Sequence, residues 1–69
     1  MRLIVNGEAR ELPERLTVAQ LVRDEAPELE RGRGVAVAVD AQVVPRSAWS
    51  DTTLSEGQRV ELLAAMQGG

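Results

Sequence analysis

The first twelve residues, Met1-Arg-Leu-Ile-Val-Asn-Gly-Glu-Ala-Arg-Glu-Leu12, contain the pattern that decides the fold. Leu3 and Val5 alternate with Arg2, as in a β-strand with one buried face. Asn6-Gly7 is the dipeptide that best accepts the two positive φ angles of a type I′ turn. Pro13 has no N–H for a strand ladder, so the second strand must end before it. The segment therefore predicts a β-hairpin.

A single amphipathic helix is predicted after the hairpin. Thr17-Val-Ala-Gln20 has the form of a capping box, in which each of the two polar side chains accepts from the other residue's backbone N–H. Apolar residues then recur at helical spacing on one stripe: Val18, Leu21, Val22 and Leu29. Pro27 disfavours a helical conformation at the residue before it, so we expect the regular helix to end near Glu25.

Three further strands are predicted over residues 35–39, 42–44 and 59–65. The first of them is apolar on both faces, as expected for a central strand of a sheet. Asp40-Ala41 and Glu56-Gly57 are turn candidates, and the arginines and glycines of residues 31–34 indicate a loop. The order strand, strand, helix, strand, short strand, strand predicts an α+β fold, a mixed four- to five-stranded sheet packed on one main helix.

The expected core is entirely aliphatic: Leu3, Val5, Val18, Leu21, Val22, Val37, Val39, Val60 and Leu62. Trp49 is expected to cover one edge of this core while its indole N–H stays exposed. Ile4 and Leu63 fall on the other face of the sheet, among charged residues. Exposed aliphatic residues there are either incidental or part of a docking patch.

Composition excludes several classes of function. The 69 residues suffice for one small domain. With no Cys and no His, the chain lacks disulfides, thiolate or imidazole metal ligands and the usual general base, so we expect neither a metal site nor an enzyme. A net charge of −3 and a single aromatic residue argue against a nucleic-acid partner. No apolar run approaches a membrane span and no signal peptide is seen, so the expected location is the cytoplasm.

The chain ends in Met66-Gln-Gly-Gly69, directly after the last predicted strand. We expect residues 1–65 to form the domain and residues 66–69 to form a flexible tail. Glycines lack Cβ atoms, so Gly68 and Gly69 can pass through a narrow channel into another protein's active site. A carboxylate is a poor acyl donor, and activation as an acyl-adenylate would let a sulfur or amine nucleophile displace AMP. The tail is the candidate site.

Four segments resemble the ThiS family, the ubiquitin-like sulfur carriers of thiamine thiazole biosynthesis. They are Leu3-Ile-Val-Asn-Gly-Glu8, Leu16-Thr-Val-Ala-Gln-Leu21, Val43-Val-Pro-Arg-Ser-Ala-Trp49 and Gly68-Gly69. The resemblance covers essentially the whole chain, in matching order and length. It implies a β-grasp fold, in which the first and last strands are parallel neighbours in the middle of the sheet.

The resemblance also implies a chemistry at Gly69. A ThiF-type adenylyltransferase would use ATP to form a glycyl adenylate there, and sulfur from a cysteine-derived persulfide would replace AMP to give C-terminal 1-thioglycine. A ThiG-type thiazole synthase would then take the sulfur. The chain would bind no cofactor itself, and Gln67 and Gly68 would be needed for entry into the partners' active sites. Candidate docking residues are Ile4, Leu63, Ala65 and Met66.

Alternatives from the same and from other classes stay open. A MoaD-like small subunit of molybdopterin synthase and carriers for tRNA thiolation or cysteine synthesis have similar sizes and endings. A ubiquitin-like modifier or binding module is a different class, which the absence of Lys weakly disfavours because the chain could not build lysine-linked chains on itself. Asp40-Ala41 and Gln58 depart from the family's usual residues, which questions the branch of the family more than the chemistry.

Overall fold

The computed structural model describes residues 1–27 and 34–64. The chain forms, in order, β1 (Arg2–Val5), β2 (Glu8–Glu11), α1 (Val18–Glu25), β3 (Val35–Val39), β4 (Gln42–Val44), the 3₁₀ helix η1 (Arg46–Asp51) and β5 (Arg59–Ala64). Every predicted strand and the predicted helix is present, and η1 was not predicted. The predictions for Leu29, for residues 31–33 of the loop, for Ala65 and for the tail at 66–69 lie outside the described residues, as does the domain boundary.

The N-terminal hairpin forms as predicted. β1 and β2 pair antiparallel from Arg2 opposite Glu11 to Val5 opposite Glu8. Asn6 and Gly7 join them with φ angles of 49° and 84°. Both angles are positive, as a two-residue turn matching the strand twist requires. The Asn-Gly dipeptide therefore fixes the register of the hairpin.

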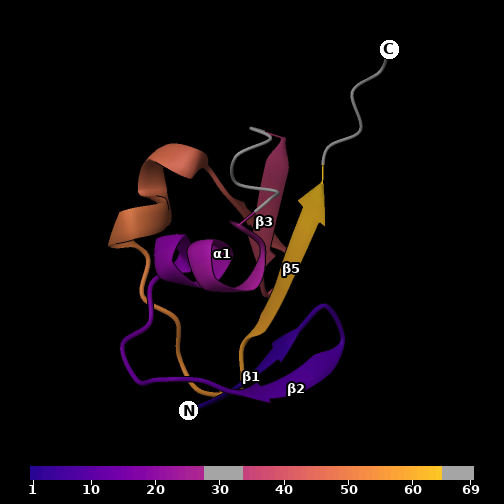
Figure 1. The fold of residues 1–69 in the computed structure, drawn as a ribbon, viewed down its shortest axis with the longest axis vertical. Helices are drawn as coiled ribbons and strands as arrows, with labels where there is room; N and C mark the ends of the chain where they lie inside the picture. Colours follow the sequence, from indigo (N-terminus) through magenta and orange to yellow (C-terminus); the bar gives the residue numbers. More distant parts are fainter. Residues whose placement is uncertain (28–33, 65–69) are drawn as a thin grey trace.

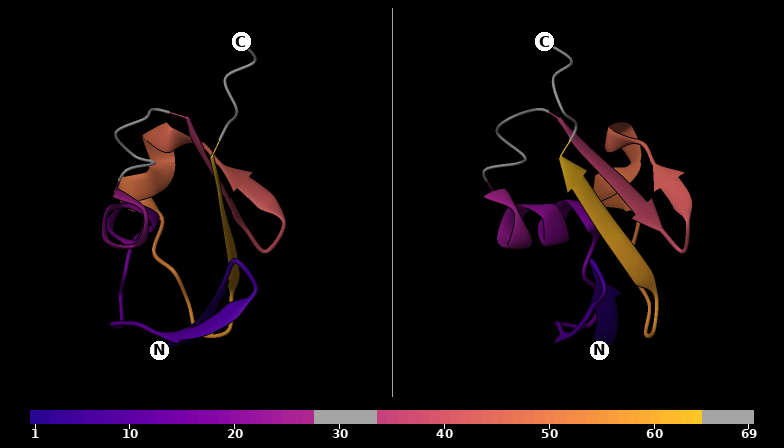
Figure 2. Two further views of the ribbon diagram at one scale, coloured as in Figure 1. Left: turned by 45° about the vertical axis from the view of Figure 1, so that its right-hand side comes forward. Right: turned by 90° about the vertical axis from the view of Figure 1, so that its right-hand side faces the viewer.

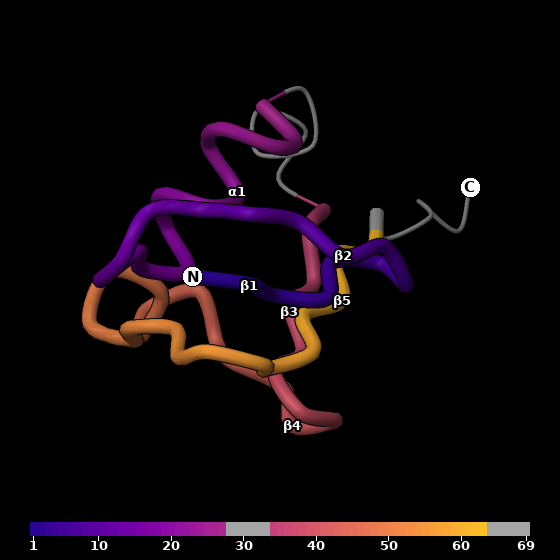
Figure 3. The backbone as a smooth tube through the Cα atoms, turned by 90° about the horizontal axis from the view of Figure 1, so that it is seen from below, coloured from indigo at the N-terminus to yellow at the C-terminus, as the bar shows by residue number. Residues whose placement is uncertain are grey.

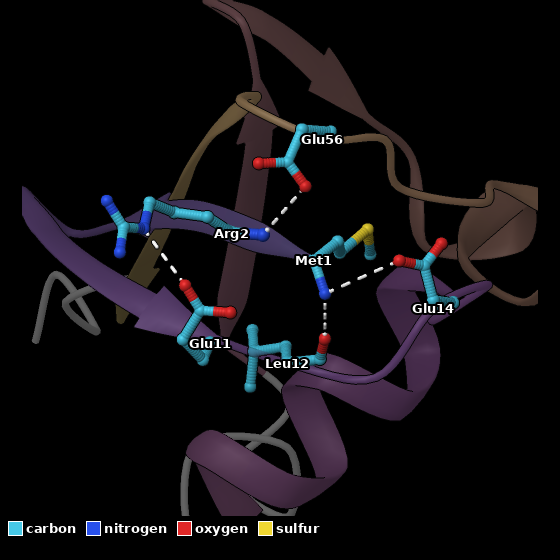
Figure 4. Close-up of polar contacts among 6 residues, drawn as sticks. All are labelled: Met1, Arg2, Glu11, Leu12, Glu14 and Glu56. Carbon is cyan, nitrogen blue, oxygen red and sulfur yellow. Dashed lines mark hydrogen bonds and ion pairs between the residues drawn. The ribbon is translucent and has the colours of Figure 1, made fainter.

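The start of β1 is held from two sides (Figure 4). The amino group of Met1 donates to the Leu12 carbonyl at 2.6 Å and lies 3.7 Å from a Glu14 carboxylate oxygen. The Arg2 backbone N–H donates to Glu56 at 2.9 Å, and its side chain pairs with Glu11 at 3.0 Å. These contacts join the first strand to the segment after β2 and to the turn before β5.

Helix α1 begins at the predicted capping box. The Gln20 N–H donates to the Thr17 hydroxyl at 3.1 Å, and the Thr17 N–H donates to the Gln20 side-chain oxygen at 2.9 Å. The helix ends at Glu25 as predicted, with Val18, Leu21 and Val22 buried.

A bidentate ion pair ties the end of α1 to β2. Both guanidinium Nη atoms of Arg10 donate to the Glu25 carboxylate, one of them at 2.9 Å. Both side chains are partly buried, which strengthens the pair relative to an exposed one. The pair fixes the position of the helix against the hairpin.

The five strands form one mixed sheet in the order β2-β1-β5-β3-β4. β1 and β5 run parallel in the middle, β5 pairs antiparallel with β3, and β3 pairs antiparallel with β4. α1 lies across one face of this sheet (Figures 1 and 2), and β4 lies at the extreme opposite α1 in Figure 3. The predicted α+β class, the mixed sheet on one helix and the β-grasp strand order are confirmed. No helix in the described part of the chain is long and apolar enough to cross a membrane.

The core between the sheet and α1 contains eight of the nine predicted residues; Val39 is only partly buried at its rim. Four buried residues were not predicted: Leu16, Ala26, Trp49 and Leu54. Leu16 and Leu54 lie in irregular segments without periodicity, and the Leu54 N–H donates to the Leu16 carbonyl at 2.8 Å. Contact between these two distant segments buries both side chains.

The prediction for the Trp49 indole was wrong. Trp49 is buried within η1, and its Nε1–H donates to the Val44 carbonyl at 2.9 Å. Pro45 ends β4, and η1 follows it directly. This 3₁₀ helix turns the chain so that the Trp49 indole reaches the last residue of β4. The Arg46 guanidinium stacks over the ring at 4.9 Å from its centroid. Burial of an indole is favourable only when its N–H finds such an acceptor.

The turn between β3 and β4 contains backbone strain at Ala41. Asp40 and Ala41 have φ angles of 49° and 70°, and the left-handed region is costly for a residue with a Cβ atom. We expect Ala41→Gly to raise the free energy of unfolding by about 0.5–1 kcal/mol, after allowing for the greater freedom of glycine in the unfolded chain. Thermal unfolding followed by Trp49 fluorescence measures this. Ala38→Gly, within β3, is the control and should lower the free energy of unfolding. An equal decrease of that free energy in both variants would contradict the presence of strain at Ala41.

Candidate functional site: the end of β5 and the adjoining sheet face

The predicted site follows β5, the central strand of the sheet. The residues predicted to act there, Gln67, Gly68 and Gly69, lie outside the described residues. The structure shows the strand that leads to them. β5 runs from the lower end of the molecule, where the N-terminus lies, to an end beside the start of β3 (Figure 1). Residues 65–69 therefore follow directly in sequence from the central strand of the sheet.

β3 supports β5 along nearly its whole length. Register pairs run from Val39 opposite Val60 to Val35 opposite Ala64. Support on the β1 side is shorter, because only Ile4 and Val5 of β1 are paired with β5. The two neighbours of β5 therefore hold its far end unequally.

Two turn residues bind the backbone of β5 with their side chains. The Asn6 side-chain oxygen accepts the Leu62 N–H at 2.9 Å, while the Asn6 N–H donates to the Val60 carbonyl at 2.9 Å. At the start of β5, an Asp40 carboxylate oxygen accepts the Arg59 N–H at 3.0 Å, and the Asp40 N–H donates to the Arg59 carbonyl at 2.7 Å. β5 is thus bound at its first residue by Asp40 and at Val60 and Leu62 by Asn6, each a turn residue that follows a neighbouring strand.

The sheet face away from α1 carries exposed aliphatic side chains beside the end of β5. We call Leu63, Ala36, Ala38 and Val43 the outer patch. Leu63 is 57% exposed and aligns with Ala36 of β3, while Val43 of β4 is 75% exposed and aligns with Ala38. Because Val60 and Leu62 are buried, strand alternation turns Leu63 to the outer face. The patch therefore crosses β5, β3 and β4 on the outer face, with Leu63 nearest the end of β5.

The four predicted docking residues are not brought together within the described residues. Leu63 is exposed as expected, but Ile4 is half-buried and aligns with Arg59, four residues before Leu63 along β5. That separation is about 13 Å at strand rise. Ala65 and Met66 lie outside the described residues. Val43 was not predicted as a docking residue, because the face on which a residue of a three-residue strand lies depends on the register of that strand. The one signal in the sequence is the aliphatic dipeptide Val43-Val44 before Pro45.

Charged residues interrupt the outer face but build no metal site. Arg59 and Glu61 are exposed on β5 between Ile4 and Leu63. Among residues 1–27 and 34–64, no group of three or more acidic side chains is placed to hold a metal ion.

Comparison with known proteins identifies the family. The sequence model of the ThiS family matches residues 3–69. This chain belongs to the ThiS family. The sulfur carrier protein ThiS of Escherichia coli K12 is 28% identical, with both chains covered completely. The crystal structure of the thiamine biosynthesis protein ThiS of Geobacter metallireducens is 34% identical and superimposes with a TM-score of 0.80, again over the full length of both chains.

A larger protein also contains a segment similar to this chain. A thiazole synthase of Paramagnetospirillum magneticum AMB-1 is 30% identical over all 69 residues of this chain, which span 20% of that protein's length. The family membership confirms the sequence-based prediction at the level of the family: a sulfur carrier protein of thiamine biosynthesis.

Proposed function

We propose that this ThiS-family chain carries sulfur in the cytoplasm on the carboxylate of Gly69. The observation that carries the proposal is the continuity of the central strand β5 with a segment ending in Gly68-Gly69, in a chain that matches the family through residue 69. A central strand is a rigid base for a short presenting segment. Residues 65–69 extend at most about 16–18 Å, enough to enter a partner's active site while the domain stays outside.

The proposed chemistry has three steps on partner proteins. In a ThiF-type adenylyltransferase, a Gly69 carboxylate oxygen attacks the α-phosphorus of ATP, pyrophosphate leaves and a glycyl adenylate forms. The terminal sulfur of a cysteine persulfide then attacks the acyl carbon and AMP leaves, giving an acyl disulfide. A thiol attacks the persulfide-derived cysteine sulfur, forms a disulfide with it and releases the thiocarboxylate, so that position 69 is 1-thioglycine.

In this proposal the chain is a co-substrate and the partners are the catalysts. ATP is bound by the activating enzyme, and this chain binds no cofactor. Gly68 and Gln67 pass through the entrance of the partner's site, where a bulky side chain at position 68 would obstruct the path. A ThiG-type thiazole synthase is the proposed sulfur acceptor, which the name of the Paramagnetospirillum relative supports.

We propose that Leu63 contributes to docking, together with Ala65 and Met66, and that Ile4 lies at the rim of the contact. Leu63→Ala is expected to raise the KM of the activating enzyme for the carrier about 5–30-fold, the effect of losing one moderate interface contact. Stability should change little, because the side chain is 57% exposed. Steady-state pyrophosphate release measures the KM.

The matched control for docking is Glu14→Ala, whose side chain is 82% exposed and lies in the segment before α1. Its KM should equal that of the unaltered chain. Val43→Ala tests whether the contact reaches β4. An unchanged KM in Leu63→Ala would remove Leu63 from the docking surface without affecting the chemistry proposed at Gly69.

The function itself is tested by intact-protein mass spectrometry of the chain from its native host grown without thiamine. We expect one oxygen to be replaced by sulfur at Gly69. Oxidation of a methionine gives a nearly equal mass change, so the sample is also treated with a thiol-directed alkylating agent. The chain has no Cys, and alkylation therefore labels a thiocarboxylate alone. Fragmentation assigns the label to the last residue.

The outcomes separate the candidate functions. A thiocarboxylate that diminishes when thiamine is supplied supports the thiazole pathway. A thiocarboxylate that does not respond to thiamine keeps the carrier chemistry and favours the molybdopterin or tRNA-thiolation alternatives. An unmodified carboxylate under every condition, with no adenylate formed by a ThiF-type enzyme, contradicts the proposal and leaves a modifier or binding module.

A further inference from the structure

Asn6 and Asp40 occupy equivalent positions on opposite sides of β5. Each is the first residue of a two-residue turn, each has a φ angle of 49°, and each uses a side-chain oxygen to accept a backbone N–H of β5. Neither bond is needed for the turn itself, because glycine or another left-handed residue would satisfy the backbone geometry. The side chains therefore have a second role, which is to bind β5.

The two bonds differ in what else holds the strand at that point. Asp40 binds Arg59 at the start of β5, where Ile4 of β1 is paired with the same residue and the pairing with β3 begins one residue later, at Val60. Asn6 binds Leu62, which lies two residues after Val60, the last residue of β5 that is paired with β1. The Asn6 side chain therefore supplies, at Leu62, an acceptor on the side where β1 is no longer paired with β5. On the opposite side only β3 supports this part of the strand.

We propose that Asn6 is a positioning residue for the reactive chain end. Its side chain keeps the backbone at Leu62 in the sheet, so that β5 and Leu63 of the outer patch hold one position at the point from which the chain continues toward Gly69. The inference rests on the proposed function, because it concerns delivery of Gly69 to the activating enzyme. Asn6 touches no reacting atom in this proposal.

The expected consequence concerns binding more than chemistry. If the Leu62 N–H loses its acceptor, the end of β5 leaves the sheet for part of the time, and only the ordered fraction presents Leu63 and the tail together. The apparent affinity then falls in proportion to the ordered fraction. Once a chain has docked, the reacting groups are unchanged. The KM for the carrier should rise while kcat stays the same.

Three variants separate positioning from stability. Asn6→Gly keeps a favourable turn dipeptide and removes the acceptor, while Asn6→Asp keeps both the turn and an acceptor oxygen. Asp40→Gly is the matched control, since it removes the equivalent bond at the start of β5. Unfolding by denaturant, followed by Trp49 fluorescence, establishes how similar the losses of stability in the two glycine variants are.

Hydrogen exchange measured by NMR tests the bond, and steady-state kinetics with the ThiF-type enzyme of the same organism test its role. We expect the Leu62 amide to exchange about tenfold faster in Asn6→Gly than in Asp40→Gly, with the reverse order for the Arg59 amide. We expect the KM for the carrier to rise about tenfold in Asn6→Gly with kcat within twofold. Asn6→Asp and Asp40→Gly should stay within about twofold of the unaltered chain in both parameters.

Two results would overturn the proposal. One is an unchanged KM in Asn6→Gly although its Leu62 amide exchanges faster. The other is an equal rise of KM in Asn6→Gly and Asp40→Gly, which would show that the KM rises because the domain is less stable and not because the Leu62 N–H has lost its acceptor. Failure of the proposed function is distinguishable, because the unaltered chain would then form no adenylate. In that case unchanged Leu62 exchange in Asn6→Gly would still refute the role of the side chain in holding β5.

Discussion

A single glycine added after Gly69 is expected to lower ATP–pyrophosphate exchange with the cognate ThiF-type enzyme by more than about 10²-fold. The extra residue moves the terminal carboxylate by about 3.3–3.6 Å along the chain and puts an amide where the carboxylate should be. An amide carbonyl oxygen is a far weaker nucleophile toward ATP. A displacement of only about 1 Å at a reacting centre can already cost about 10²-fold in rate.

The fold of the extended chain should be unchanged, because the addition is made beyond the five-stranded sheet described for residues 1–27 and 34–64. Equal unfolding curves by Trp49 fluorescence check this. As a control, a carboxypeptidase that removes the added residue should restore exchange. Normal exchange by the extended chain would exclude Gly69 as the residue that is adenylated.

Leu21→Ala is expected to give the largest loss of stability that we predict, about 3–5 kcal/mol. Leu21 is fully buried on the inner face of α1, among the largest side chains of the core. Its truncation removes buried methyl groups and leaves a cavity that a small core cannot fully close. A chain of 69 residues has a total stability of about 3–10 kcal/mol. We therefore expect the Tm to fall by at least about 12 °C.

Leu63→Ala is the matched control for the Leu21 variant. The same side chain is truncated, but Leu63 is 57% exposed on the outer face and leaves no cavity. Its Tm should stay within a few degrees of that of the unaltered chain. Trp49 is the only aromatic residue, and it is buried, so its fluorescence reports both transitions without labelling. A small Tm change in Leu21→Ala would contradict the packing of α1 on the sheet.

Most of the secondary structure could be predicted from short-range interactions between residues close in sequence. Asn6-Gly7 and Thr17 with Gln20 specify a turn and a helix start through bonds and φ angles within four residues. Pro13 and Pro45 end strands because proline lacks an N–H. Such signals do not depend on the rest of the fold, and the sequence was sufficient to predict them.

Burial outside regular elements could not be predicted in the same way. Leu16 and Leu54 become core residues because two irregular segments meet, and Trp49 because η1 turns its indole toward the Val44 carbonyl. No periodicity marks these positions. The outer patch has the same origin, since Val43 and Leu63 come to share one face of the sheet only through the registers of β4 with β3 and of β3 with β5.

The sequence by itself determined the elements of this protein, its Gly-Gly ending and, through its resemblance to the ThiS family, the order of the strands. These depend on residue type and short spacing along the chain. Only the tertiary structure decided which residues support the last strand. Asn6 and Leu62 are separated by 56 positions, and their hydrogen bond exists because β1 ends where β5 continues. Long-range hydrogen bonds of this kind depend on where strands end relative to one another, which no local pattern encodes.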